Sequence, residues 1–102
     1  MQLPSDPVLR ELLPEFLHGW QHELQRVLEA AQAHNEAELY RLGHTLKGTS
    51  LQFGLTELAE LGIELMECAR THAWDDVVPL CERIRAELRS VQCVLANSQG
   101  ER

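Results

Sequence analysis

The chain has 102 residues, of which 44% are apolar, 25% charged and 5% aromatic. A single domain of this size can bury a sufficient core without disulfides or a structural metal, but it is too short for a kinase, a dinucleotide-binding domain or a barrel enzyme. Nine basic residues against 16 acidic ones give a formal net charge of -7, which would repel a phosphate backbone. We therefore expect no nucleic-acid partner.

The start of the chain and its cysteines bear on where the protein works. Residues 1–6 carry neither a basic nor an apolar leader segment, and no run of about 18 apolar residues occurs anywhere. Three cysteines at long spacings, Cys68, Cys81 and Cys93, fit neither a disulfide framework nor a zinc pattern. We expect a soluble cytoplasmic protein with reduced thiols and no membrane contact, with the first two cysteines packed in the core and Cys93 off its apolar stripe.

The first predicted element is a long helical stretch that begins after Asp6. This residue can cap the helix, and Pro7 suits its first position. Pro14 lies inside the stretch, where proline removes a hydrogen bond and clashes one turn back. We expect a kink or a break there. A break would leave a short extra N-terminal helix before Pro14. The apolar residues recur at helical spacing: Leu9, Leu13, Phe16, Trp20, Leu24, Val27 and Ala31.

Two shorter helices follow in the middle of the chain. Asn35 is an N-cap for the second helix and Gly54 a stop for it. The third helix is predicted from Thr56 to a point near His72. The second stripe consists of Leu39, Leu42, Leu46, Thr49 or Ser50, and Phe53, and the third of Leu58, Leu61, Leu65, Cys68 and Ala69.

The last predicted helix starts at a cap provided by Asp75 or Asp76. Its stripe steps alternately by four and three residues, which is the spacing of a bundle seam: Val77, Cys81, Ile84, Leu88, Val91 and Leu95. Four amphipathic helices with short loops predict an all-α, antiparallel up-and-down four-helix bundle. The whole chain, 1–102, is expected to form this one domain, with a frayed tail over 98–102.

The most informative segment is 43–50, in the middle of the second predicted helix. At about 100° per residue, His44 projects roughly 180° from the apolar stripe and should face solvent. Lys47 at i+3 and Gly48 at i+4 lie beside it on the same surface. A glycine inside a helix costs about 1 kcal/mol relative to alanine, and Gly43 adds a similar penalty. Such exceptions to local preference often mark function.

The side chains of this segment have complementary chemistry. An imidazole is largely neutral at pH 7, which leaves a nitrogen lone pair for attack, and Lys47 would supply positive charge to stabilise a phosphoryl group. Gly48 would leave a bare patch where a large group can approach, and Leu51 at i+7 would add an apolar docking contact. The plainer alternative is an ordinary surface histidine, a glycine that permits close helix packing and a solvated lysine.

With these residues the chain resembles the histidine-containing phosphotransfer (HPt) domains of two-component phosphorelays. The family pattern is a histidine, a lysine three residues later, a glycine four later, small residues next, and a second glycine ten after the histidine. The stretch 58–70 also looks like the family's third helix, and Trp74-Asp75 after the following turn is family-like. The positions of this chain that match the motif are His44, Lys47, Gly48, Thr49, Ser50 and Gly54.

The resemblance implies a role for each matching residue. His44 would be the phosphoacceptor, Lys47 the cation beside the phosphoryl group, and Gly48 the residue that clears the approach. The chain departs from the family at Gln52, where asparagine is frequent, and at residues 72–73, where the family has a glycine-containing turn. These departures bear on loop geometry and partner choice. The docking surface is expected to include Tyr40, Leu51, Gln52 and Leu55.

The resemblance also implies the partners and excludes some activities. The partners would be receiver domains of response regulators and of hybrid sensor kinases, and the receiver would supply the Mg²⁺, so this chain needs no cofactor or metal. It would be a phosphoryl carrier without autokinase activity, and a monomer, since a shuttle must leave each partner after transfer. Two alternatives remain: a helical adaptor that binds a receiver or a sensor kinase without transferring phosphate, and an unrelated four-helix interaction module.

Other histidines are weaker candidates for chemistry. His18 and His22 lie one turn apart and could hold a metal with Glu23 nearby, but two histidines alone make a weak site. His34 and His72 are placed near predicted helix ends, where a cation suits the helix dipole. We assign no catalytic role to any of them.

Overall fold

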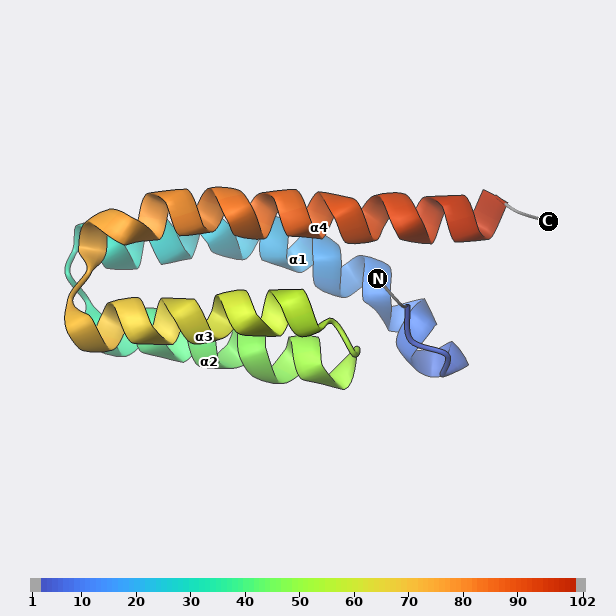
Figure 1. Ribbon diagram of the computed structural model, residues 1–102, viewed down its shortest axis with the longest axis horizontal. Coiled ribbons are helices and arrows are strands. Elements are labelled where there is room, and N and C mark those ends of the chain that lie inside the picture. Colours follow the sequence, from blue (N-terminus) through green and yellow to red (C-terminus); the bar gives the residue numbers. More distant parts are fainter. Residues whose placement is uncertain (1–2, 101–102) are drawn as a thin grey trace.

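Four α-helices joined by short turns make up the fold. The computed structural model describes residues 3–100, with a single 3₁₀ turn, η1 (Trp74–Asp76), before the last helix. Figure 1 shows successive helices running in opposite directions, so the predicted all-α, antiparallel bundle is confirmed. The helices are α1 (Pro7–Gln32), α2 (Glu36–Gln52), α3 (Thr56–Thr71) and α4 (Val77–Gly100).

Helix α1 passes through Pro14 without a break. Leu13 and Leu17, on the buried side of this stretch, are fully enclosed, and their packing offsets the hydrogen bond that proline cannot donate. The N-terminal turns of α1 bend away from α4 (Figure 1). The predicted alternative of a separate short helix before Pro14 is therefore wrong, because tertiary packing holds both sides of the proline in one helix.

The caps predicted for α1 and α2 and the stop predicted after α2 are confirmed, whereas Asp75 and Asp76, predicted as alternative caps of the last helix, lie in the turn η1 directly before α4. Asp6 caps α1 by accepting a hydrogen bond from the Val8 amide at 2.8 Å, and Asn35 caps α2 by accepting one from the Glu38 amide at 3.1 Å. Gly54 follows α2 in the left-handed region at φ 74°, which an L side chain adopts only with strain.

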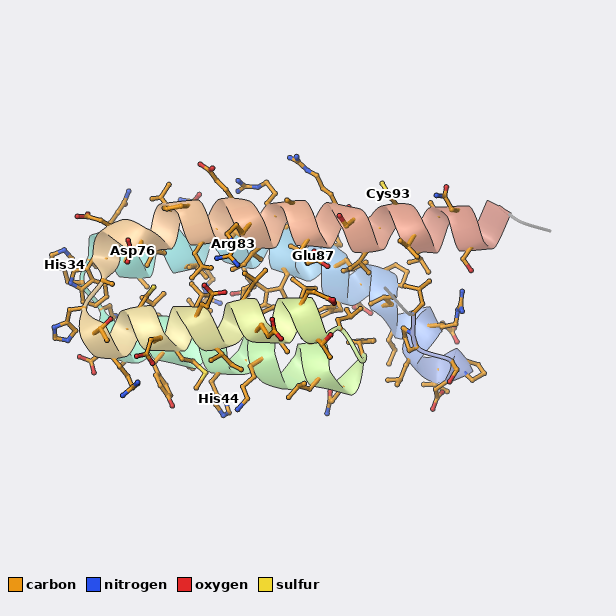
Figure 2. All side chains as sticks on the ribbon, viewed as in Figure 1. His34, His44, Asp76, Arg83, Glu87 and Cys93 are labelled. Carbon is orange, nitrogen blue, oxygen red and sulfur yellow. The ribbon has the colours of Figure 1, made fainter. Side chains whose placement is uncertain are left out.

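Two histidines take left-handed backbone conformations at the other helix ends. His34 follows α1 at φ 51° and His72 follows α3 at φ 57°. Both rings stack on Trp74, with centroid separations of 5.0 and 5.4 Å, and His72 Nε2 lies 2.6 Å from a carboxylate oxygen of Glu36. These contacts offset the backbone strain and join the turns at the end of the bundle where Figure 2 labels His34 and Asp76.

The core lies along the shared axis of the four helices. The apolar stripe predicted for α4 is buried throughout: Val77, Cys81, Ile84, Leu88, Val91 and Leu95. Helices α1 and α4 extend beyond the α2–α3 hairpin at one end (Figure 1), and Arg10 of α1 donates a 2.7 Å hydrogen bond to Ser98 of α4 there. Helix α4 continues to Gly100, so the described part of the tail predicted over 98–102 is helical. Residues 101–102 lie outside the described part of the chain. No helix within residues 3–100 is long and apolar enough to cross a membrane.

The three cysteines are expected to differ sharply in reactivity. Burial raises the pKa of the Cys81 thiol to about 11 and also raises that of Cys68, whereas Cys93 is exposed on α4 (Figure 2). At pH 8 a thiol-reactive chromogenic disulfide should titrate one thiol in the native protein and three after unfolding in guanidinium. Cys93→Ser should abolish the native reaction, and fast titration of all three native thiols would contradict the packing.

Candidate functional site

The candidate site lies on the outer face of α2. The buried residues of this helix turn toward the core, and His44 lies on the other side, exposed to solvent. Figure 2 shows His44 projecting outward from the α2–α3 side of the bundle, away from α4. The amphipathic spacing of α2 therefore determines the exposure of the imidazole, as the sequence predicted.

The neighbours of His44 along α2 make its two flanks different. Tyr40 lies one turn earlier, and its ring centroid is 6.5 Å from that of the imidazole with the planes 19° apart. Gly48 lies one turn later, and a Cβ placed on it would meet no atom within 4 Å. The imidazole therefore has an aromatic ring beside it on one flank and open space on the other. The alternative that Gly48 permits close helix packing is wrong.

Lys47 provides the positive charge nearest to this open flank. Its side chain is half-buried, and no carboxylate among residues 3–100 lies within ion-pairing distance of its ammonium group. Arg41, on the same helix, is engaged by Glu38 through hydrogen bonds of 2.7 and 3.0 Å, and this pairing holds the pKa of the Glu38 carboxyl below its usual value. Lys47 is therefore the cation of α2 that remains available to an incoming anion.

The second glycine of the segment, Gly43, has a packing role. A Cβ on Gly43 would lie 2.8 Å from the carbonyl oxygen of Gly62 on α3, and a Cβ on Gly62 would lie 2.6 Å from the backbone nitrogen of Lys47. Both contacts are closer than a real Cβ tolerates. The two glycines allow the backbones of α2 and α3 to touch, and this helix pair has the most extensive contact in the bundle.

Of the predicted docking residues, three are accessible and one is not. Tyr40 and Leu51 are 38% and 52% exposed, and Gln52 is also exposed. Leu55 is only 3% exposed, so its prediction as a docking residue is wrong. After the left-handed Gly54 the Leu55 amide donates a 2.9 Å hydrogen bond to the Ser50 carbonyl, a capping pattern that turns the following apolar side chain back onto the helix end.

One accessible apolar residue near the site is absent from the sequence prediction. Ile63 of α3 is 47% exposed, whereas the leucines of the same helix are buried. The available signal is that Ile63 stands outside the leucine spacing of its helix. Its position relative to α2 could not be deduced, because it depends on the contact between two helices.

The histidine pair on α1 offers little for metal binding. His18 and His22 are exposed, with their rings in edge contact at 4.8 Å between centroids. In the part of the chain that the structure describes, no three histidine, cysteine, aspartate or glutamate side chains gather as metal ligands would. A metal would find at most a two-ligand site at this pair.

The fold and the site together define a class of protein, a helical bundle in which a solvent-facing histidine stands beside a lysine and a bare glycine. Comparison with protein families gives the same class: the model of the Hpt domain matches residues 11–92. The chain therefore belongs to the Hpt domain family. Members of this family are phosphoryl carriers that exchange phosphate with receiver domains in two-component signalling. No curated protein and no solved structure matched the chain.

Proposed function

We propose that this chain carries a phosphoryl group on His44, accepting it from the aspartyl phosphate of one receiver domain and passing it to another. The observation that carries the proposal is the combination around His44: an exposed imidazole, an open flank at Gly48 and, at Lys47, a cation that pairs with no carboxylate of residues 3–100. A surface histidine without function would need none of these. In this proposal the chain works in the cytoplasm as a carrier and has no autokinase activity.

The proposed transfer is an in-line displacement at phosphorus. A neutral ring nitrogen of His44 uses its lone pair to form the N–P bond, while the P–O bond of the aspartyl phosphate breaks and its electron pair leaves with the carboxylate. Positioning and neutralisation of charge account for most of the catalysis in reactions of this type. On this chain Lys47 offers the ammonium group, and Gly48 leaves room for the receiver surface. The Mg²⁺ is proposed to belong to the receiver, and this chain would bind none.

The test is transfer of labelled phosphate from receiver domains. A panel of receivers, each phosphorylated by its own kinase or by a small phosphodonor, is mixed with the protein. We expect label to reach the protein, to be lost in acid and kept in alkali as a phosphohistidine is, and to be located on His44 by mass spectrometry. If receivers bind and no label moves, the chain is a helical adaptor. If no receiver binds, it is an interaction module of another kind.

Replacing Lys47 with alanine should slow transfer by about tenfold, because a charge-assisted hydrogen bond to a phosphoryl oxygen contributes about 1.5 kcal/mol or more. Binding of the unphosphorylated receiver should change much less. The measurement is the single-turnover transfer rate beside the receiver dissociation constant.

Arg41→Ala is the matched control for the lysine variant. Arg41 is on the same helix and carries the same charge, but Glu38 already engages it, so its loss should leave the transfer rate within about twofold. Equal rates for Lys47→Ala and the wild-type protein would show that the lysine is only a solvated charge.

A further inference from the structure

The surface around His44 continues from α2 onto α3. The two helices touch at Gly43 and Gly62, where a Cβ on Gly62 would lie 2.8 Å from the Gly43 carbonyl oxygen and 2.6 Å from the Lys47 backbone nitrogen. Where two backbones touch, the distance between the helix axes is as short as helix packing allows, so the outer faces of the two helices lie side by side. The residue beside Gly62 on the outer side of α3 therefore lies next to the histidine helix.

The register of this contact places Ile63 beside His44. A Cβ on Gly43 would also lie 2.9 Å from the backbone nitrogen of Met66, so Gly43 is at the level of residues 62–66 of α3. His44 and Ile63 each follow the contacting glycine by one residue, a rotation of about 100°. Because the helices are antiparallel, both rotations turn toward the same outer side. The two side chains therefore project from neighbouring helices less than one turn apart along the axis.

Ile63 also extends an apolar surface that is otherwise confined to α2. Six large apolar side chains are exposed among the described residues, and three of them, Tyr40, Leu51 and Ile63, belong to α2 and α3. Tyr40 and Leu51 lie four residues before and seven after the histidine, so both share its face of α2. Exposed apolar side chains gathered beside a reactive polar group are typical of a protein-interaction site.

We propose that the receiver-docking surface crosses from α2 onto α3 and that Ile63 is its specificity-determining contact on α3, facing an apolar side chain of the receiver. This inference rests on the proposed function and deepens it. The occupant is a receiver domain because the same face presents His44, the group that a receiver must reach. Lys47 separates the apolar contacts and provides the polar part of the surface.

The test compares Ile63→Ser with Val78→Ser. Val78 is also a β-branched residue and is 53% exposed, but it lies in the first turn of α4, at the end of the bundle away from the α2–α3 turn. For Ile63→Ser we expect the KM for the phosphorylated receiver to rise about fivefold with kcat within about twofold, because only a docking contact is lost. Val78→Ser should match the wild-type protein in both constants.

A small phosphodonor, phosphoramidate, separates docking from the chemistry of His44. It needs no docked protein, so Ile63→Ser and the wild-type protein should be phosphorylated by it at equal rates. A slower reaction of Ile63→Ser with phosphoramidate would overturn the docking role, since the change would then act on His44 or on the fold. An unchanged receiver KM would also overturn it, while transfer that still depends on His44 would leave the proposed function standing.

Two further outcomes distinguish other occupants of this face. If the wild-type protein transfers nothing, the proposed function fails. Receiver binding is then measured for the His44→Gln variant and for the double variant that also carries Ile63→Ser. Equal dissociation constants for the two, or no binding by either, would overturn the docking role of Ile63. If Ile63→Ser instead changes only the self-association of the protein in sedimentation, the surface serves a second copy of the chain and the receiver assignment is wrong.

Discussion

Replacing His44 with glutamine is expected to abolish phosphoryl transfer, lowering its rate by at least about 10³-fold, while the fold and receiver binding are retained. Glutamine is close to histidine in size and polarity, but its amide nitrogen has no free lone pair for attack on phosphorus. The side chain is exposed on a regular helix, so the free energy of unfolding should change by less than about 0.5 kcal/mol. The measurements are single-turnover label transfer, receiver binding and urea unfolding on the same preparations.

His22→Gln is the matched control for this variant. His22 is likewise exposed on a regular helix but lies on α1, so the His22→Gln variant is expected to transfer phosphate at the wild-type rate. Residual transfer by His44→Gln at the wild-type rate would mean that another nucleophile carries the group. Loss of transfer together with loss of receiver binding would indicate that the histidine contributes to docking more than to chemistry.

The second large effect is expected when the same substitution is made at two glycines. Gly48→Ala should stabilise the protein by about 1 kcal/mol, because alanine favours the helix and a Cβ there meets no atom within 4 Å. Gly62→Ala should destabilise it by about 2 kcal/mol despite the same gain in helix propensity. The added methyl would lie 2.6 Å from the Lys47 backbone nitrogen, and backbone atoms can move aside only if the helices separate.

Urea unfolding followed by circular dichroism at 222 nm measures both changes. Each variant is the other's control, since composition and the loss of glycine are identical and only the surroundings differ. The two midpoints should move in opposite directions from the wild-type value. Stabilisation of both variants would show that α2 and α3 do not pack through their backbones, and the register that places Ile63 beside His44 would then fail as well.

Helical periodicity explains how much of this fold can be deduced from the sequence. The stripe of α4, the caps at Asp6 and Asn35 and the stop at Gly54 depend on residues within a few positions of one another. Of the kink or break expected at Pro14, the break is wrong for the complementary reason. Local preference disfavours proline inside a helix, but the packing of Leu13 and Leu17 against the other helices keeps α1 continuous.

The residues of the candidate site also fall into those that helical periodicity predicts and those that depend on tertiary packing. His44, Lys47 and Gly48 lie within five consecutive residues of one helix, so their common face follows from the helical repeat. Leu55 was misplaced because one left-handed residue before it redirects the chain, and its side chain then has the core of the bundle within reach. An apolar residue next to a turn has no periodicity that distinguishes docking from burial.

The helical class, the solvent-facing histidine and the lysine and glycine beside it can be deduced from the amino-acid order, because each depends on angles within a single helix. The packing of Gly43 and Gly62, which brings α3 against Lys47 and puts Ile63 at the level of His44, follows only from the arrangement of the helices in space. The physical reason is that the register between two helices is set by how their surfaces fit together. That fit brings together residues about 20 positions apart in the chain, and the helical repeat does not relate residues at such a separation.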